Sequence, residues 1–181
     1  MNSVYPSSLE SIIEFFKKFP GIGEKSAERM ALSILNIPLD EIQIASNALV
    51  KARETLHPCD VCGHLTDSLK CNICEDEARN KNLICVVEDY KSIYAFEKAG
   101  NFKGVYHVLN GLISPIDDIG VDDINLSSLI RRIKELENPE LILALKGTIE
   151  GETTTLYIKK IFENKNVKIS RLSYGLPSGA E

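Results

Sequence analysis

Cys59-Asp60-Val61-Cys62 and Cys71-Asn72-Ile73-Cys74 are two Cys-x-x-Cys pairs separated by a loop of eight residues, and the rest of the chain is arranged around them. Pairs this close bring four thiolates onto one tetrahedral metal ion, and zinc is the ion that four thiolates favour. Sulfur then fills every position, which leaves no open site for a catalytic water. Two disulfides or four buried thiols are the alternatives. We predict one structural zinc ion, with His57 and His64 beside it as bystanders.

The length and net charge of the chain limit the number of domains and the kind of nucleic-acid binding that we expect. The 181 residues suit one ordinary domain or two small ones, and the net charge of -5 excludes a uniformly basic nucleic-acid binder. Any contact with DNA must therefore come from a local basic surface. Residues 1–8 lack a basic region followed by an apolar run, and no apolar segment approaches the roughly 18 residues that span a bilayer. We expect a cytoplasmic protein that does not enter the membrane.

Three helices are expected in the first third of the chain, over residues 9–16, 24–35 and 39–54, because apolar residues recur there at helical spacing. The inward positions of the second and third helices are Ala27, Met30, Ala31, Ile34, Ile42, Ala45 and Leu49. Pro38 separates these two helices.

The first two helices are joined by a glycine hairpin with basic residues beside it. Gly21 and Gly23 flank one apolar residue, which permits a tight turn whose N–H groups point at a phosphate. Lys25 and Arg29 are four residues apart and share a helical face. The segment resembles the helix-hairpin-helix module, which grips the DNA backbone without reading sequence. The alternative is a glycine turn between two packed helices with solvated charges.

After the cysteines, strands alternate with helices. Strands are expected at 83–87, 105–109, 141–145 and 167–172, and helices at 92–99, 126–136 and 153–162. This alternation predicts a parallel sheet covered on both faces, in which functional residues gather at the carboxyl ends of the strands.

Those carboxyl ends carry Glu88 and Asp89 after the first strand, His107 in the second, and residues 146–152 after the third. The arrangement resembles the Toprim fold of topoisomerases and primases. In that fold a glutamate ends the first strand and an Asp-x-Asp-x-Asp-Gly segment follows the third. Lys146 and Thr148 stand where the first two aspartates belong, and only Glu150 with the glycine after it matches. A Mg²⁺-dependent Toprim nuclease or primase-like enzyme is therefore the alternative function, and Lys146 argues against it.

Taken in order, the strings PGIGEKSAERMA, CNIC, LICVVED, YHVLNGLISPIDDIG, TIEGETTTLYI and SRLSYGLPSG resemble the RecR family of bacterial recombination-repair proteins. The resemblance implies a non-enzymatic mediator that forms ring-like homo-oligomers, dimers or tetramers, around DNA. It also implies action with RecO and RecF in loading RecA onto single strands coated by SSB. On this basis DNA contacts fall at Gly21, Gly23, Lys25 and Arg29, zinc ligands at Cys59, Cys62, Cys71 and Cys74, and the RecO-facing surface at Glu88, Asp89, His107 and Glu150. A scaffold with no DNA role is a further alternative.

The expected fold class is α/β multidomain: an N-terminal helix-hairpin-helix module at 1–55, a C4 zinc finger at 56–78, and a Toprim-like parallel α/β domain at 79–172. Two departures from the family pattern stand out. Residues 143–148 read LALKGT where the family usually has LATNPT. Residues 173–181 form a shortened tail, so dimers built through the N-terminal modules stand beside a closed tetrameric ring as the expected oligomers.

Overall fold

The structure is a computed structural model, and it describes residues 4–172. The chain divides into two compact units, Met1–Glu54 and Thr55–Glu181. The cysteine segment therefore belongs to the same unit as the sheet, where the sequence suggested a module of its own. The predicted tail at 173–181 lies outside the described residues.

The first unit is helical. It contains α1 (Ser7–Phe16), α2 (Glu24–Ser33), a 3₁₀ turn (Ile34–Asn36) and α3 (Leu39–Thr55). Helices α1 and α2 pack around Ile13, Ala27 and Ala31, which are buried as predicted for the two alanines. The small alanines let the two helices approach closely, and Ile22 from the hairpin packs against the same cluster. Met30, expected inward, is exposed.

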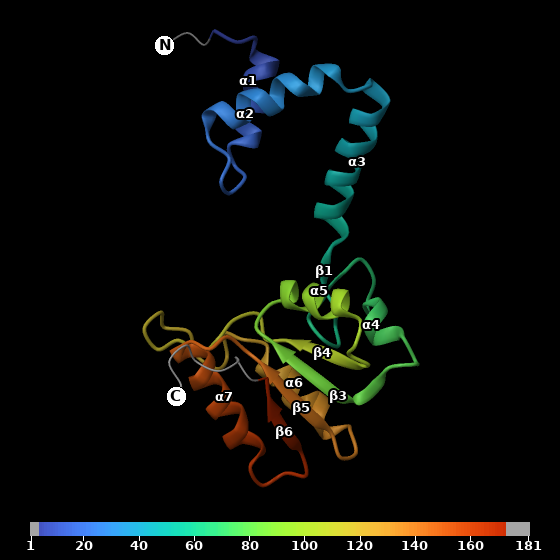
Figure 1. The fold of residues 1–181 in the computed structure, drawn as a ribbon, viewed down its shortest axis with the longest axis vertical. Coiled ribbons are helices and arrows are strands. Elements are labelled where there is room, and N and C mark those ends of the chain that lie inside the picture. The colour runs from blue at the N-terminus through green and yellow to red at the C-terminus, as the bar shows by residue number, and fades with distance from the viewer. Residues whose placement is uncertain (1–3, 173–181) are drawn as a thin grey trace, which may run out of the picture. The chain divides into compact units, whose positions relative to one another are not determined.

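Helix α3 departs most from the sequence expectation, because none of its residues is buried. Leu49 was expected inward, yet it is 59% exposed, and Ile44 is 69% exposed. The apolar residues of α3 recur as predicted, but the other described elements of the first unit do not bury them. Figure 1 draws α3 as a separate rod within the first unit.

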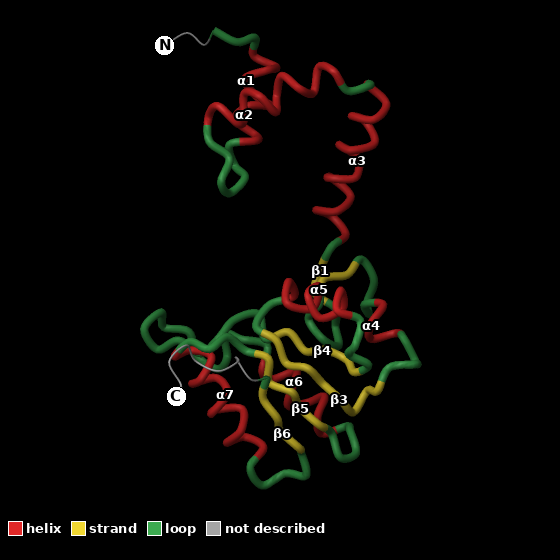
Figure 2. Tube along the Cα trace, in the orientation of Figure 1, coloured by secondary structure: helices red, strands yellow, loops and turns green. Residues whose placement is uncertain are grey.

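The second unit begins with a two-stranded antiparallel ribbon, β1 (His57–Pro58) and β2 (Leu65–Thr66), and the short helix α4 (Asn72–Glu75). Four parallel strands follow: β3 (Asn80–Val87), β4 (Gly104–Val108), β5 (Glu140–Ala144) and β6 (Lys168–Arg171). They pair in the order β4-β3-β5-β6 (Figure 2). The parallel α/β sheet that the sequence predicted is confirmed.

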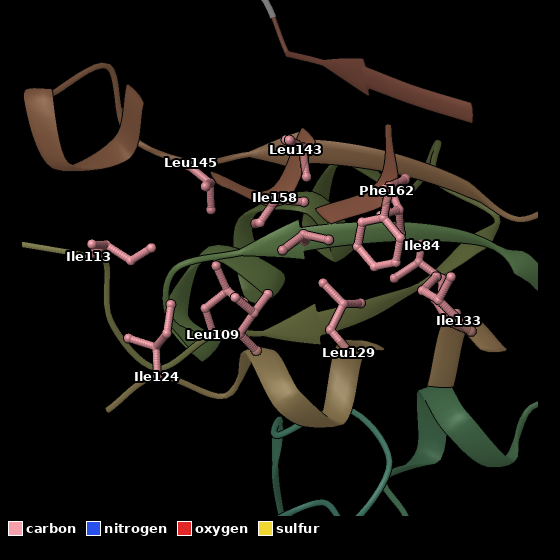
Figure 3. Packing of buried hydrophobic residues seen from close by; sticks show 14 residues of the cluster. Ile84, Leu109, Ile113, Ile124, Leu129, Ile133, Leu143, Leu145, Ile158 and Phe162 are labelled. Carbon is pink, nitrogen blue, oxygen red and sulfur yellow. The ribbon is translucent and has the colours of Figure 1, made fainter. Parts of the chain in front are cut away.

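Three helices cover this sheet from two sides. Helices α6 (Leu126–Lys134) and α7 (Ile149–Phe162) pack on the face that carries Ile84 and Val86 of β3. Figure 3 shows Leu129 and Ile133 of α6 pointing into the same cluster as Phe162 of α7. Helix α5 (Tyr90–Ala99) packs on the opposite face, against Cys85, Val87 and Tyr106. Alternate residues of β3 thus feed two cores, as expected for a strand buried on both faces.

The cysteine segment is bonded to the edge of the sheet. The N–H of Val108 in β4 donates to the carbonyl of Cys62 at 2.7 Å. Within residues 4–172, no helix combines the length and the apolar character that a bilayer span requires.

Candidate functional site

The four predicted metal ligands come together. The Sγ atoms of Cys59, Cys62, Cys71 and Cys74 all lie within 4.8 Å of one another, and three of these cysteines are buried. A tetrahedral zinc ion with Zn–S bonds of about 2.3 Å has sulfur–sulfur edges of roughly 3.8 Å, so the observed spacing suits such an ion. The cysteines are free thiols in the structure and are not paired in disulfides.

Backbone N–H groups donate hydrogen bonds to the Sγ atoms of both cysteines of the first Cys-x-x-Cys pair. Gly63, directly after Cys62, has a φ of +74°, and a Cβ there would meet the carbonyl oxygen of Val108 at 3.2 Å. This turn lets the N–H of His64 donate to the Sγ of Cys62 at 3.4 Å, while the N–H of Cys71 donates to the Sγ of Cys59 at 3.3 Å. Both bonds favour the negatively charged thiolate that a metal ion requires.

Four thiols at this distance resist losing their protons together. The pKa of Cys62 is raised far above its ordinary value, because its sulfur shares protons with the neighbouring sulfurs of Cys71 and Cys74 and because it is buried. A divalent cation removes this penalty, since it replaces the shared protons by metal–sulfur bonds. The donor set and its electrostatics therefore both fit a tetrahedral thiolate-bound ion.

Neither histidine belongs to the group of ligands, as the sequence predicted. The His64 ring stands edge-on to Tyr94 of α5, with ring centroids 5.4 Å apart. The exposed His57 keeps its Nδ1 beside the carbonyl of Pro58, 3.0 Å away. Through this ring contact His64 packs the cysteine segment against α5.

The glycine hairpin between α1 and α2 has the expected backbone. Gly21 has a φ of +81°, which favours glycine, and the N–H of Ile22 closes the turn on the carbonyl of Phe19 at 3.1 Å. Gly23 precedes α2 as its N-cap in extended conformation. The exposed turn thus leads directly into the positive end of a helix, the position at which backbone N–H groups bind phosphate oxygens.

Lys25 and Arg29 both lie exposed on α2. Lys25 is the second residue of that helix, where a positive charge is unfavourable to the helix dipole. Its position therefore does not contribute to helix stability, whereas it suits an incoming anion. Lys17, the residue that follows α1, forms ion pairs instead. Its Nζ lies 2.8 Å from Glu14 Oε1 and 3.3 Å from Glu24 Oε2.

At the carboxyl edge of the sheet, an ion pair occupies the centre. Lys146 Nζ lies 2.8 Å from Glu88 Oε1. The pKa of Lys146 is raised because its ammonium donates to Glu88 and feels that negative charge. The ammonium therefore neutralises the one glutamate that matches the Toprim pattern at the first strand.

The other candidate residues at this edge are engaged in capping helices. Asp89 is the N-cap of α5 and accepts from the N–H groups of Lys91 and Ser92. Thr148 caps α7 by accepting from the N–H of Gly151 at 3.3 Å. Within residues 4–172, the four cysteines are the one group of three or more potential ligands close enough to share a metal ion. The carboxylates of this edge do not converge on a common point.

His107 was expected on the partner-facing surface, and this expectation is wrong. The residue is fully buried in β4, and its Nε2–H donates to the carbonyl of Asn125 at 2.8 Å. Burial lowers its pKa to about 4, so the ring is neutral. Its neighbours in the strand are all apolar or aromatic, a signal in the sequence that it faces a core.

Sequence reasoning noted Gly151 only as a match to the Toprim pattern and missed its close contact with the backbone of Lys146. A Cβ at this position would overlap the carbonyl oxygen of Lys146, so the first turn of α7 touches the backbone that follows β5. The glycine between two glutamates was the available signal.

The comparisons with known proteins agree with this architecture. Residues 9–53 match the model of the RecR helix-hairpin-helix, and residues 82–173 match that of the Toprim domain. The recombination proteins RecR of Staphylococcus aureus strains JH9 and Newman are each 45% identical to this chain over 177 residues, which cover 98% of this chain and 89% of the relative. The chain belongs to the RecR family. The matched relatives are recombination proteins by name.

Proposed function

We propose that this RecR-family chain is a DNA-binding mediator of recombinational repair. In this proposal it forms a ring-like homo-oligomer and acts with RecO and RecF to help load RecA onto single strands coated by SSB. The observation that carries the proposal is the exposed glycine hairpin, with Lys25 and Arg29 on the helix that follows it. That the protein is located in the cytoplasm stays a prediction.

The hairpin supports contact with the DNA backbone and no reading of bases. Gly21 and Gly23 leave backbone N–H groups open to phosphate oxygens, and the two cations add charge-assisted bonds. None of these groups distinguishes one base from another, so we expect binding that is independent of sequence and sensitive to salt.

The test is the double substitution Lys25→Ala with Arg29→Ala, measured by fluorescence anisotropy with labelled duplex DNA over a range of salt. We expect weaker binding and a salt slope that is smaller by about one for each phosphate that the variant no longer neutralises. The melting temperature should not change, because both side chains are exposed. Lys159→Ala with Lys160→Ala, on α7, is the matched control of equal charge. Unaltered binding of the first variant at low salt would exclude the hairpin as the contact.

We propose Zn²⁺ as the resident ion of the four cysteines. The donor set of four sulfurs and the spacing of their Sγ atoms support zinc over harder ions such as Mg²⁺, which prefer oxygen. Bound zinc supplies a structural cross-link here and no catalytic water.

A homo-oligomer, dimer or tetramer, accounts for α3. A helix whose apolar residues stay exposed, among them Ile44 and Leu49, gains stability by packing on another chain. An oligomer also multiplies a weak hairpin contact, since several copies act at high effective concentration. Light scattering should therefore give a multiple of the mass of one chain, and Ile44→Asp should reduce it. A monomeric wild-type chain would contradict this part of the proposal.

The RecO-facing surface remains a proposal at Glu88, Asp89 and Glu150. Among these, Glu150 is the residue best placed for a partner, because Glu88 pairs with Lys146 and Asp89 caps α5. Hydrogen bonds from its own N–H and from the hydroxyl of Thr148 lower the pKa of Glu150, which keeps this carboxylate charged. A basic partner fits such an edge.

A further inference from the structure

A pocket lies between the cysteine segment and α5, two parts of the second unit that are neighbours in Figure 1. Its volume of about 390 Å³ falls within the range of small-molecule binding sites. Two of its lining residues, Leu56 and Tyr94, are 42% and 54% exposed, so the pocket is open to solvent. A small molecule, or one residue of a longer polymer, can therefore enter it.

One side chain in the wall of this pocket is buried without a hydrogen bond. His64 is 8% exposed, and its Nδ1 is buried with no hydrogen-bond partner among residues 4–172. Buried polar atoms in folded proteins are nearly always paired, because an unpaired one loses its bonds to water and gains none in return. The backbone N–H of His64 donates to Cys62 and its ring stands against Tyr94, so the imidazole is fixed in place. An unpaired nitrogen fixed in a pocket wall indicates a ligand atom beside it.

The rest of the lining favours a flat ligand with polar edges. Leu65, Ile73 and Ile93 contribute aliphatic surface, and the half-exposed ring of Tyr94 offers a surface for stacking. Asn72, exposed at the start of α4, supplies an amide that both donates and accepts hydrogen bonds. A planar ring that carries donors and acceptors along its edge matches these groups.

The charges of the lining select an uncharged ring. In the described part of the chain no lysine or arginine lines the pocket, whereas Asp67 and Glu97 contribute carboxylates, so a phosphate is disfavoured. Glu97 is already paired with Arg79 at 2.9 Å and with the Tyr106 hydroxyl at 2.7 Å. An aliphatic side chain would suit the apolar wall but leave His64 Nδ1 unpaired. A nucleobase is uncharged, and its edge bears donors and acceptors, so it pairs with either tautomer of His64.

We propose that this pocket binds one unpaired nucleobase, which stacks on Tyr94 and forms hydrogen bonds with His64 Nδ1 and the Asn72 amide. The inference rests on the proposed DNA-binding function and deepens it. Bases of a duplex are stacked and paired inside the helix, so a single strand presents a base for insertion and an intact duplex does not. The pocket therefore adds to the phosphate contacts of the hairpin a contact that selects single strands. A free nucleoside carries the same chemistry and is the other source of such a base.

The test compares two labelled single strands of equal length, one of oligo-dT and one in which every base is absent, so that their phosphates are the same. Fluorescence anisotropy with the full chain should show that the oligo-dT strand binds about tenfold more tightly, as stacking of one base predicts. Tyr94→Ser should abolish this preference. His64→Phe keeps an aromatic ring beside Tyr94 and should reduce the preference roughly threefold, because the hydrogen bond is lost. Both variants should retain the metal content and the melting temperature of the unsubstituted chain.

Tyr157→Ser, which replaces another partly exposed tyrosine on α7, is the matched control and should keep the preference. Thymidine, observed by ligand-detected NMR, is the second probe. Thymidine binding that Tyr94→Ser abolishes, without a preference between the strands, would assign the pocket to a free nucleoside. The proposal is overturned if the chain binds both strands equally and does not bind thymidine, or if Tyr94→Ser keeps the preference. Failure of the DNA-binding function would appear differently, as binding of both strands that Lys25→Ala with Arg29→Ala does not change.

Discussion

Two places in this chain have the pattern of a metal site, and the structure treats them differently. At the cysteine group, four ligands from two short segments meet within 4.8 Å. At the carboxyl edge of the sheet, the fold is that of a Toprim domain, but Lys146 occupies the centre and pairs with Glu88 at 2.8 Å. The cysteine group keeps four ligands for a metal cation. At the carboxyl edge, the positive charge beside Glu88 is the ammonium group of Lys146.

The comparison separates what a fold provides from what a site requires. Parallel strands bring their carboxyl ends to one edge whatever residues stand there, so the edge persists when the ligands change. The cysteine segment has no such scaffold: its two short strands and one short helix bury few residues, so we expect its structure to depend on the proposed metal ion. Removal of a ligand should therefore be severe at the cysteines and mild at the edge.

Cys71→Ser is expected to have the largest effect. It removes one of four thiolates, and the segment that it holds is bonded to β4 through Cys62 and Val108. Removal of the metal costs several kcal/mol or more in small metal-held segments, so we expect loss of zinc and of soluble yield. Elemental analysis and thermal melting check this result. Cys85→Ala, a buried cysteine outside the group, should keep the zinc and lower the stability by only about 1 kcal/mol. Equal zinc content in the two variants would contradict the assignment.

Gly151→Ala should have the next largest effect. The added Cβ would overlap the carbonyl oxygen of Lys146, a backbone atom that cannot turn aside. Separating α7 from the end of β5 should cost about 1–3 kcal/mol, as overpacking does elsewhere. Chemical denaturation measures the decrease in stability. Gly120→Ala is the control, because its nearest contact is the Asp123 side chain at 3.4 Å. If both variants are equally stable, the edge is not held by this close approach.

Lys146→Asp tests the carboxyl edge directly and should have the smallest effect. It replaces the ammonium by a second carboxylate beside Glu88, and because Lys146 is 62% exposed, solvent limits the cost to about 1 kcal/mol. Millimolar Mn²⁺ should then raise the melting temperature of this variant and not that of the unsubstituted chain, because two carboxylates bind a hard cation. Lys146→Ala is the matched control and should not respond to Mn²⁺. A response of the unsubstituted chain would show that Lys146 does not exclude the ion.

Much of this architecture follows from local signals in the sequence. The strand at Leu83 to Val87 is a continuous apolar run, and the four cysteines have the spacing of a tetrahedral site, so both were predictable. The first residues of the helices were harder to predict. The helices at Asp89 and Thr148 begin earlier than apolar periodicity suggests, because each residue caps its helix with a side-chain oxygen.

What the sequence could not reveal depends on three-dimensional neighbours. The apolar residues of α3 have helical spacing, but spacing does not show that the other helices of the first unit leave Leu49 exposed. The apolar neighbours of His107 in its strand favour a buried position, but its hydrogen-bond partner, the carbonyl of Asn125, is known only from the packing of the loop before α6. Lys146 and Glu88 are far apart in the sequence, and their ion pair depends on adjacent strands β3 and β5.

The most direct test of the contrast between the two sites is the metal content of the purified chain after dialysis against both Zn²⁺ and Mg²⁺, measured by native mass spectrometry. The account predicts one zinc ion per chain, absent in Cys71→Ser, and no retained magnesium. A chain that retains no zinc, or that holds magnesium only while Glu88 is present, would contradict it.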